Sequence, residues 1–152
     1  MNEKNRPIGW TLGLRCFIPA KRERVFDALT DPLTLAKWWG PNGFSCPSIE
    51  FEPRVGTTYR IAMQPPDGEL FYLSGEFRRV SPPRQLAFTF VWDPPAPEDQ
   101  ETLAELSLDD EPSGTAITLT QGPFATEARR ELHETGWSEG FERLRSLFDR
   151  QL

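Results

Sequence analysis

The sequence has few of the residues from which reactive or metal-binding sites are usually built. It contains 2 cysteines and 1 histidine in 152 residues. Cys16 and Cys46 have neither CxxC spacing nor a neighbouring histidine, so we expect both to be buried as small apolar side chains, with a disulfide as the less usual alternative. His133 lacks the second histidine four residues further on that a zinc motif would have. The sequence therefore predicts no metal site, and a surface or rim position for His133.

Long apolar runs and basic clusters are also missing. No segment approaches the roughly 18 apolar residues that would span a bilayer, and the polar start, Met1 to Pro7, does not resemble a signal peptide. With 23 acidic and 17 basic residues, the net charge is −6, which argues against nucleic acid as a partner. We expect a soluble, cytoplasmic protein without membrane contact. Its length fits one domain, over residues 10–152, after a flexible segment over residues 1–9.

Motifs for nucleophilic or phosphate chemistry are absent as well. There is no GxSxG nucleophile elbow, no GxGxxG turn and no phosphate-binding loop. Acidic pairs occur at Glu98-Asp99 and within 109–111, both in turn or loop sequence, where we expect solvated carboxylates rather than acid–base catalysts. The sequence predicts neither an enzyme nor a cofactor.

The hydrophobic pattern predicts an α+β fold. Apolar residues alternate over Trp10–Ile18, which indicates a strand, and two short helices are expected over 21–29 and 31–38, the second capped by Asp31 with Pro32 at its first position. Six strands follow between residues 49 and 120, and an amphipathic helix covers 127–152. Polar residues occupy the other face of the strands, so we expect an antiparallel sheet with one solvent-exposed, wet face. The sheet should curve, and its apolar face should wrap the last helix. These residues are Arg60, Ser74, Glu76, Arg78, Thr89, Thr118 and Thr120.

Aromatic residues are abundant, with 11 Phe and 5 Trp. Most fall on the apolar face of the expected sheet or on the facing side of the last helix, which also carries Leu132 on its apolar side. An aromatic face of this kind suits either a packed core or a pocket for a small molecule. The candidate ligand-binding residues are Trp38, Trp39, Phe51, Tyr59, Met63, Phe71, Phe88, Phe90, His133, Trp137 and Phe141.

Two features of the chain bear on that choice. Trp38 and Trp39 are adjacent, and neighbouring side chains point about 100° apart on a helix, so we expect one ring inside and the other at a surface, a rim or a pocket mouth. The alternative is that both simply pack on a tight corner.

Gly136 and Gly140 weaken the last helix by about 1 kcal/mol each. They either leave room for a ligand or let the helix approach a bulky strand residue such as Phe88.

Several segments resemble one known family. They are residues 20–32, the run Trp38-Trp39-Gly40-Pro41, Gly56 with Tyr59, residues 80–83, and His133-Glu134 with Gly136-Trp137. In this order they resemble bacterial proteins similar to the C-terminal domain of the heat-shock-protein-90 ATPase activator, within the START-like and birch-pollen-allergen-like superfamily. The resemblance implies a helix-grip fold, with an internal cavity between the last helix and the sheet. The two short helices and the Trp38-Trp39 pair would close this cavity at one end. Members include hydrophobic-ligand binders, sequestering resistance proteins and cyclases.

Three functions are compatible with this sequence. The first is the binding of a small hydrophobic ligand, oriented by Tyr59 or His133. The second is an interaction module that assists a chaperone or regulator under stress, with an exposed Trp39 or the acidic surface as its contact; direct activation of the chaperone is not expected, because the sequence has no room for the activator's N-terminal domain. The third is a cyclase or hydrolase that needs two of Tyr59, Arg60, Tyr72 and His133 to point inward together. A homodimer is compatible with each of them.

Overall fold

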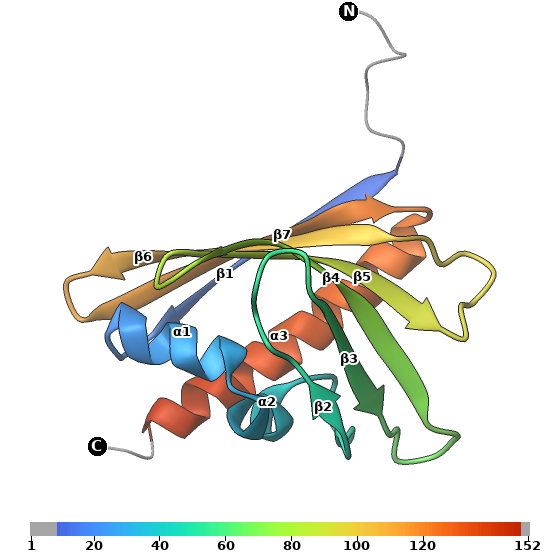
Figure 1. Cartoon of the computed structure of the whole chain (residues 1–152), viewed down its shortest axis with the longest axis horizontal. Helices are drawn as coiled ribbons and strands as arrows, with labels where there is room; N and C mark the ends of the chain where they lie inside the picture. Colours follow the sequence, from blue (N-terminus) through green and yellow to red (C-terminus); the bar gives the residue numbers. More distant parts are fainter. Residues whose placement is uncertain (1–8, 150–152) are drawn as a thin grey trace, which may run out of the picture.

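The computed structural model describes residues 9–149 and has the expected order of elements (Figure 1). Except for Gly9, the predicted flexible segment over 1–9 lies outside the described residues, as do residues 150–152 of the predicted last helix. The elements are β1 (Trp10–Ile18), α1 (Arg22–Thr30), α2 (Pro32–Trp38), β2 (Ile49–Glu50), β3 (Thr58–Met63), β4 (Phe71–Ser81), β5 (Gln85–Asp93), β6 (Thr102–Glu111), β7 (Gly114–Phe124) and α3 (Glu127–Asp149).

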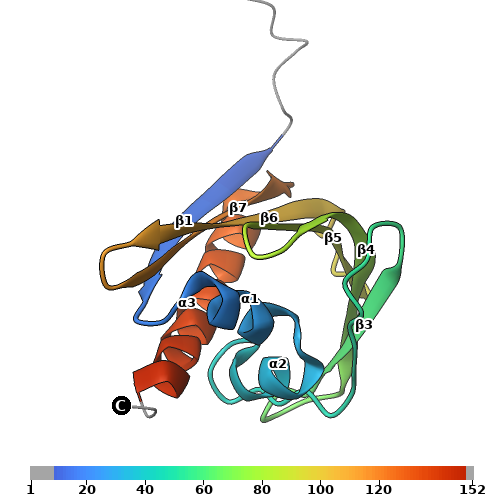
Figure 2. The ribbon, with the colours of Figure 1, turned by 60° about the vertical axis from the view of Figure 1, so that its left-hand side comes forward.

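One antiparallel sheet holds these seven strands in the order β1-β7-β6-β5-β4-β3-β2. The strands from β2 to β7 pair with their neighbours in sequence, whereas β1 crosses over to pair with β7, with Leu14 opposite Leu119. The sheet curves, and all three helices lie on its concave side (Figure 2). This is the α+β, helix-grip arrangement that the sequence predicts.

The start of α2 follows from local chemistry. Asp31 Oδ2 accepts a hydrogen bond from the backbone N–H of Thr34 at 3.0 Å, and Pro32 occupies the first turn, as expected of a capped helix start. The helix ends after Trp38, because Trp39 is extended and Gly40 has a φ of +94°, a conformation that favours glycine. The chain therefore turns sharply at Trp38-Trp39-Gly40-Pro41, which we call the tryptophan corner.

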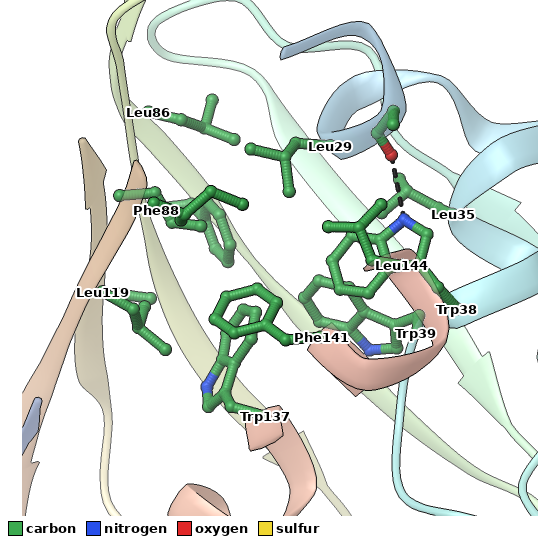
Figure 3. Close-up of a cluster of buried hydrophobic side chains, with 14 of the residues drawn as sticks. Leu29, Leu35, Trp38, Trp39, Leu86, Phe88, Leu119, Trp137, Phe141 and Leu144 are labelled. Carbon is green, nitrogen blue, oxygen red and sulfur yellow. Dashed lines mark hydrogen bonds between the residues drawn. The ribbon is translucent and has the colours of Figure 1, made fainter. Parts of the chain in front are cut away.

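The hydrophobic core fills the space between the concave face of the sheet and the helices. Figure 3 shows side chains from α1, α2, α3 and the strands meeting there, among them Leu29, Leu86 and Leu144. Gly75 allows two strands to approach closely, because a Cβ at this position would lie 1.9 Å from the carbonyl oxygen of Thr89. The core is continuous from the tryptophan corner to the far strands.

The expectations for Thr89, Cys16, Cys46 and Leu132 are wrong. Thr89 is buried and its hydroxyl accepts from the Glu76 N–H at 2.8 Å, so it does not belong to the wet face. Cys16 and Cys46 are free but only half-buried. Leu132 is 55% exposed rather than packed into the core. The residue next to it in sequence faces inward instead, as described below.

Candidate ligand-binding site

A cavity of about 420 Å³ lies between α3, the tryptophan corner and the strands β3, β4 and β5. Its inner wall is aromatic and includes Trp39, Phe90 and Trp137, all of which are buried. Its outer part is bordered by more exposed apolar side chains, Leu70 at 37% and Leu132 at 55% exposure. The cavity is thus an apolar recess that is open at one end.

Seven of the predicted site residues line this cavity. They are Trp38, Trp39, Met63, Phe71, Phe90, His133 and Trp137. The cavity also has lining residues that were not among the candidates: Gly40, Pro41, Phe44, Glu69, Leu70, Trp92, Pro94, Ala96, Asp99, Arg129, Leu132, Gly136 and Gly140. Trp92 could have been found, because it continues the alternation of Phe88 and Phe90 along β5. Pro94 and Ala96 come from an irregular loop whose sequence gives no such signal.

The other four candidates do not line the cavity. Phe51, Tyr59 and Phe88 pack together with ring centroids 5.3–6.1 Å apart. The Tyr59 hydroxyl donates to the carbonyl oxygen of Thr89 at 2.6 Å, and burial raises its pKa well above the usual value. Phe141 stacks on Trp38 at 6.1 Å. These rings fill the core beside the cavity, so Tyr59 is not available to orient a ligand.

Neither tryptophan of the corner lies at the surface, so of the positions expected for the second ring only one beside the pocket remains. Trp38 is 1% and Trp39 7% exposed, and their ring centroids are 5.4 Å apart. The helical angle between neighbours does not apply, because α2 ends at Trp38 and Trp39 has extended backbone. The rings still have different surroundings. Trp38 donates to the carbonyl oxygen of Ala28 at 2.9 Å, whereas Trp39 packs against Trp137 at 5.0 Å and Phe90 at 6.4 Å.

His133 is buried at 8% exposure rather than lying at the surface. Its Nε2 accepts the indole N–H of Trp92 at 2.8 Å, and its Nδ1 lies 2.6 Å from the carbonyl oxygen of Arg129. A carbonyl can only accept, so Nδ1 carries the proton and the ring is neutral. Burial is the main cause that lowers the pKa of His133. Both nitrogens are thus occupied, and His133 presents only its ring to the cavity.

Asp99, expected to be a solvated loop acid, instead forms part of the cavity wall. Its side chain is 7% exposed and is paired with the guanidinium of Arg129 on α3. The other carboxylate oxygen accepts the backbone N–H of Ala96 at 2.7 Å. The ion pair therefore fastens the β5–β6 loop to α3. Local sequence could not reveal this contact, because the two residues are 30 positions apart.

One of the two helix glycines, Gly140, serves a close approach, although not to a strand. A Cβ on Gly140 would lie 3.1 Å from the carbonyl oxygen of Trp38, and one on Gly136 would lie 3.6 Å from Cγ of Pro41. Arg143, one turn further on, donates to the carbonyl oxygens of Trp38 and Gly40. Helix α3 therefore packs directly on the tryptophan corner. Both glycines also border the cavity. The same side of α3 therefore packs closely on the corner at Gly140 and leaves space for a ligand.

The comparisons with solved structures find the same fold in several bacterial proteins. A protein from Chromobacterium violaceum superimposes with a TM-score of 0.83 at 27% identity, covering 91% of this chain and 96% of its own. A Nitrosomonas europaea protein gives a TM-score of 0.78 at 27% identity over 93% and 95% of the two chains. A Silicibacter pomeroyi protein, 23% identical over 94% and 100%, shares the fold with a TM-score of 0.82.

Comparison with curated proteins gives no significant match. Within residues 9–149, no helix combines the length and the apolar character needed to cross a membrane. The family model for the activator of Hsp90 ATPase homolog 1-like protein matches residues 19–149. This match extends over most of the chain and agrees with the shared fold. The chain therefore belongs to the family of activator of Hsp90 ATPase homolog 1-like proteins.

Proposed function

We propose that this protein binds a small, mostly apolar and uncharged molecule in the cavity between α3, the tryptophan corner and the sheet. The observation that carries the proposal is the cavity itself. Its volume of about 420 Å³ lies within the range of roughly 300–1,000 Å³ of small-molecule sites. Its inner wall of aromatic rings offers large apolar contact areas at fixed positions. An apolar ligand would remove this surface from water.

The charges around the cavity favour an uncharged ligand. Three charged side chains line it, and two of them, Asp99 and Arg129, neutralise each other. The third, Glu69, is exposed toward solvent. Burying a charge without a partner carries a large free-energy cost. A ligand with a charged group deep in this cavity would therefore bind poorly.

The two alternatives receive less support from the geometry. Trp39 is buried, so it cannot be the exposed contact of an interaction module, and a chaperone contact stays a prediction that the family description motivates. A cyclase or hydrolase would need two inward polar residues. Only His133 of the four lines the cavity, because Tyr59 is in the core and Arg60 lies 3.8 Å over the ring of Tyr72. That the protein is not an enzyme also stays a prediction.

The proposal can be tested with N-phenylnaphthylamine, a neutral aromatic probe whose emission rises in an apolar site. We expect saturable binding of one probe per protein chain. The variant Gly136→Leu places a side chain in the cavity and should weaken binding at least tenfold. Thr135→Leu is the matched control, since Thr135 neighbours Gly136 on α3 but is exposed and outside the cavity lining.

Two outcomes would contradict the proposal. One is the absence of saturable probe binding to the wild-type protein at micromolar concentrations. The other is equal loss of binding in Gly136→Leu and Thr135→Leu, which would place the probe elsewhere. Circular dichroism of both variants checks that they remain folded. Native mass spectrometry of the protein from its own source would then identify a co-purifying apolar compound.

A further inference from the structure

Four tryptophans line the cavity, and three of their indole N–H groups already have protein partners. Trp38 donates to the carbonyl oxygen of Ala28 at 2.9 Å. Trp92 donates to His133 Nε2 at 2.8 Å. Trp137 donates to Gln121 Oε1 at 2.7 Å. The side-chain amide of Gln121 in turn donates to the hydroxyl oxygen of Thr102 at 2.9 Å. These three rings therefore present only carbon to a ligand.

The indole N–H of Trp39 is different. It forms no hydrogen bond with any residue of the described range 9–149. It is not fully enclosed either, because the fully buried, unpaired side-chain nitrogen and oxygen atoms in that range are Nε of Arg22 and Nε of Arg129. The Trp39 nitrogen therefore borders open space. Since the ring is only 7% exposed and lines the cavity, we take that space to be the cavity.

The acceptor atoms of His133 and Asp99 in the same wall already receive hydrogen bonds from protein donors. The one basic nitrogen of His133 accepts from Trp92. The Asp99 carboxylate accepts from Arg129 and from the Ala96 N–H. Among the side chains of the inner wall, Trp39 therefore has a donor without a protein acceptor. An N–H that meets only an apolar ligand loses its water and gains nothing, at a cost of about 1–3 kcal/mol.

The surroundings of Trp39 also limit the shape of a ligand. Its ring packs against Phe90 at 6.4 Å, with an interplanar angle of 30°, and against Trp137 at 5.0 Å, with an angle of 72°. Phe90 and Trp137 are 6.2 Å from each other, so the three rings form one cluster. Aromatic rings prefer offset-stacked and edge-to-face partners. A flat ring system can make both kinds of contact in this cavity, with its edge toward the Trp39 nitrogen. A flexible aliphatic chain would use neither.

We infer that Trp39 determines ligand specificity: its indole N–H donates a hydrogen bond to a carbonyl-type oxygen on the edge of an uncharged, planar aromatic ligand. This inference rests on the proposed function, because it assigns the ligand class of the same cavity. It also gives the two rings of the tryptophan corner separate roles. Trp38 holds the corner to α1 through Ala28, and Trp39 forms the hydrogen bond to the ligand.

The test uses two probes of nearly equal size and shape. Fluorene has no acceptor, whereas fluorenone carries one carbonyl oxygen on its edge. One neutral hydrogen bond is worth about 1 kcal/mol, so we expect fluorenone to bind the wild-type protein roughly fivefold more tightly. In ¹H–¹⁵N spectra, fluorenone should move the Trp39 indole N–H signal downfield, whereas fluorene should not. The signal is assigned through nuclear Overhauser contacts, so this readout does not depend on a variant.

Trp39→Phe removes the donor and keeps an aromatic ring. In this variant the preference for fluorenone should disappear, while fluorene binds within about threefold of its wild-type affinity. Trp10→Phe is the control, because Trp10 is exposed and lies outside the cavity lining; the preference should persist. Equal affinity of the wild-type protein for both probes would overturn the inference and leave the proposed function standing. Binding of neither probe would overturn both.

Discussion

The indole nitrogen of Trp38 lies 2.9 Å from the carbonyl oxygen of Ala28 (Figure 3). Ala28 is in the last turn of α1, where backbone carbonyls have no partner within the helix. A side chain of α2 therefore satisfies the end of α1. Since Trp38 also contacts α3 beside Gly140, this one residue joins all three helices and sets the position of Trp39 at the cavity.

Replacing Trp38 with phenylalanine should destabilise the fold. Trp38→Phe removes the donor and leaves the Ala28 carbonyl without its partner, so we expect the free energy of unfolding to fall by about 1–3 kcal/mol. Urea denaturation measures this change. Trp10→Phe is the control: Trp10 is exposed, and its replacement should change the free energy of unfolding by less than about 0.5 kcal/mol. Equal effects of both substitutions would refute the role of the Trp38 hydrogen bond.

The two helix glycines should respond in opposite directions to alanine. In Gly136→Ala the added Cβ would meet Pro41 at an ordinary contact distance of 3.6 Å, so higher helix propensity should raise the free energy of unfolding by about 0.5–1 kcal/mol. In Gly140→Ala it would lie 3.1 Å from the Trp38 carbonyl oxygen, which Arg143 holds in place. We expect this variant to be less stable than the wild type. Urea midpoints in the reverse order would show that α3 does not pack on the corner as described.

Breaking the ion pair in the cavity wall should loosen the β5–β6 loop. Asp99→Asn removes the charge that balances Arg129, and we expect the free energy of unfolding to fall by about 1–3 kcal/mol. Hydrogen exchange of the backbone amides over residues 94–101 should become faster in this variant. The neighbouring Glu98→Gln is the control, because Glu98 is exposed. If exchange in the loop is unchanged in Asp99→Asn, the ion pair does not hold the loop.

The protein should lose stability as the pH falls below about 6.5. The pKa of His133 in the folded protein is lowered from 6.5, mainly by burial, so below this pH the unfolded chain binds a proton that the folded protein does not. The free energy of unfolding should therefore decrease from pH 6.5 downward and level off below the folded pKa. Protonation would also set an N–H on Nε2 against that of Trp92.

This pH dependence can be measured directly because His133 is the single histidine of the chain. Its ring proton signals in an NMR titration need no assignment among histidines, and their midpoint should lie below 6.5. Urea denaturation of His133→Gln between pH 5 and 7 should show little of the slope seen in the wild type. A midpoint at or above 6.5 would contradict the buried, neutral ring.

Local sequence patterns predict most of the fold. The alternation over Trp10–Ile18 and the cap at Asp31 both correspond to elements of the structure, because strand pleat and helix capping are decided by neighbouring residues. The prediction for the inner face of α3 was wrong near the start of the helix. Leu132 was expected to be buried there, but it is exposed and His133 is buried instead. Hydrophobicity favours leucine, but the hydrogen bond from Trp92 on β5 makes the histidine suitable for burial.

The candidate site was predictable in kind but not in detail. The sequence alone determined that an aromatic sheet face would meet an amphipathic helix, since both follow from periods of two and 3.6 residues. Only the tertiary structure decided which rings pack in the core, as Phe88 does, and which border the cavity, as Trp39 does. That division depends on contacts between distant segments, such as Gly140 with Trp38 and Arg129 with Asp99. Such contacts follow from how the elements pack in three dimensions, which residue spacing does not encode.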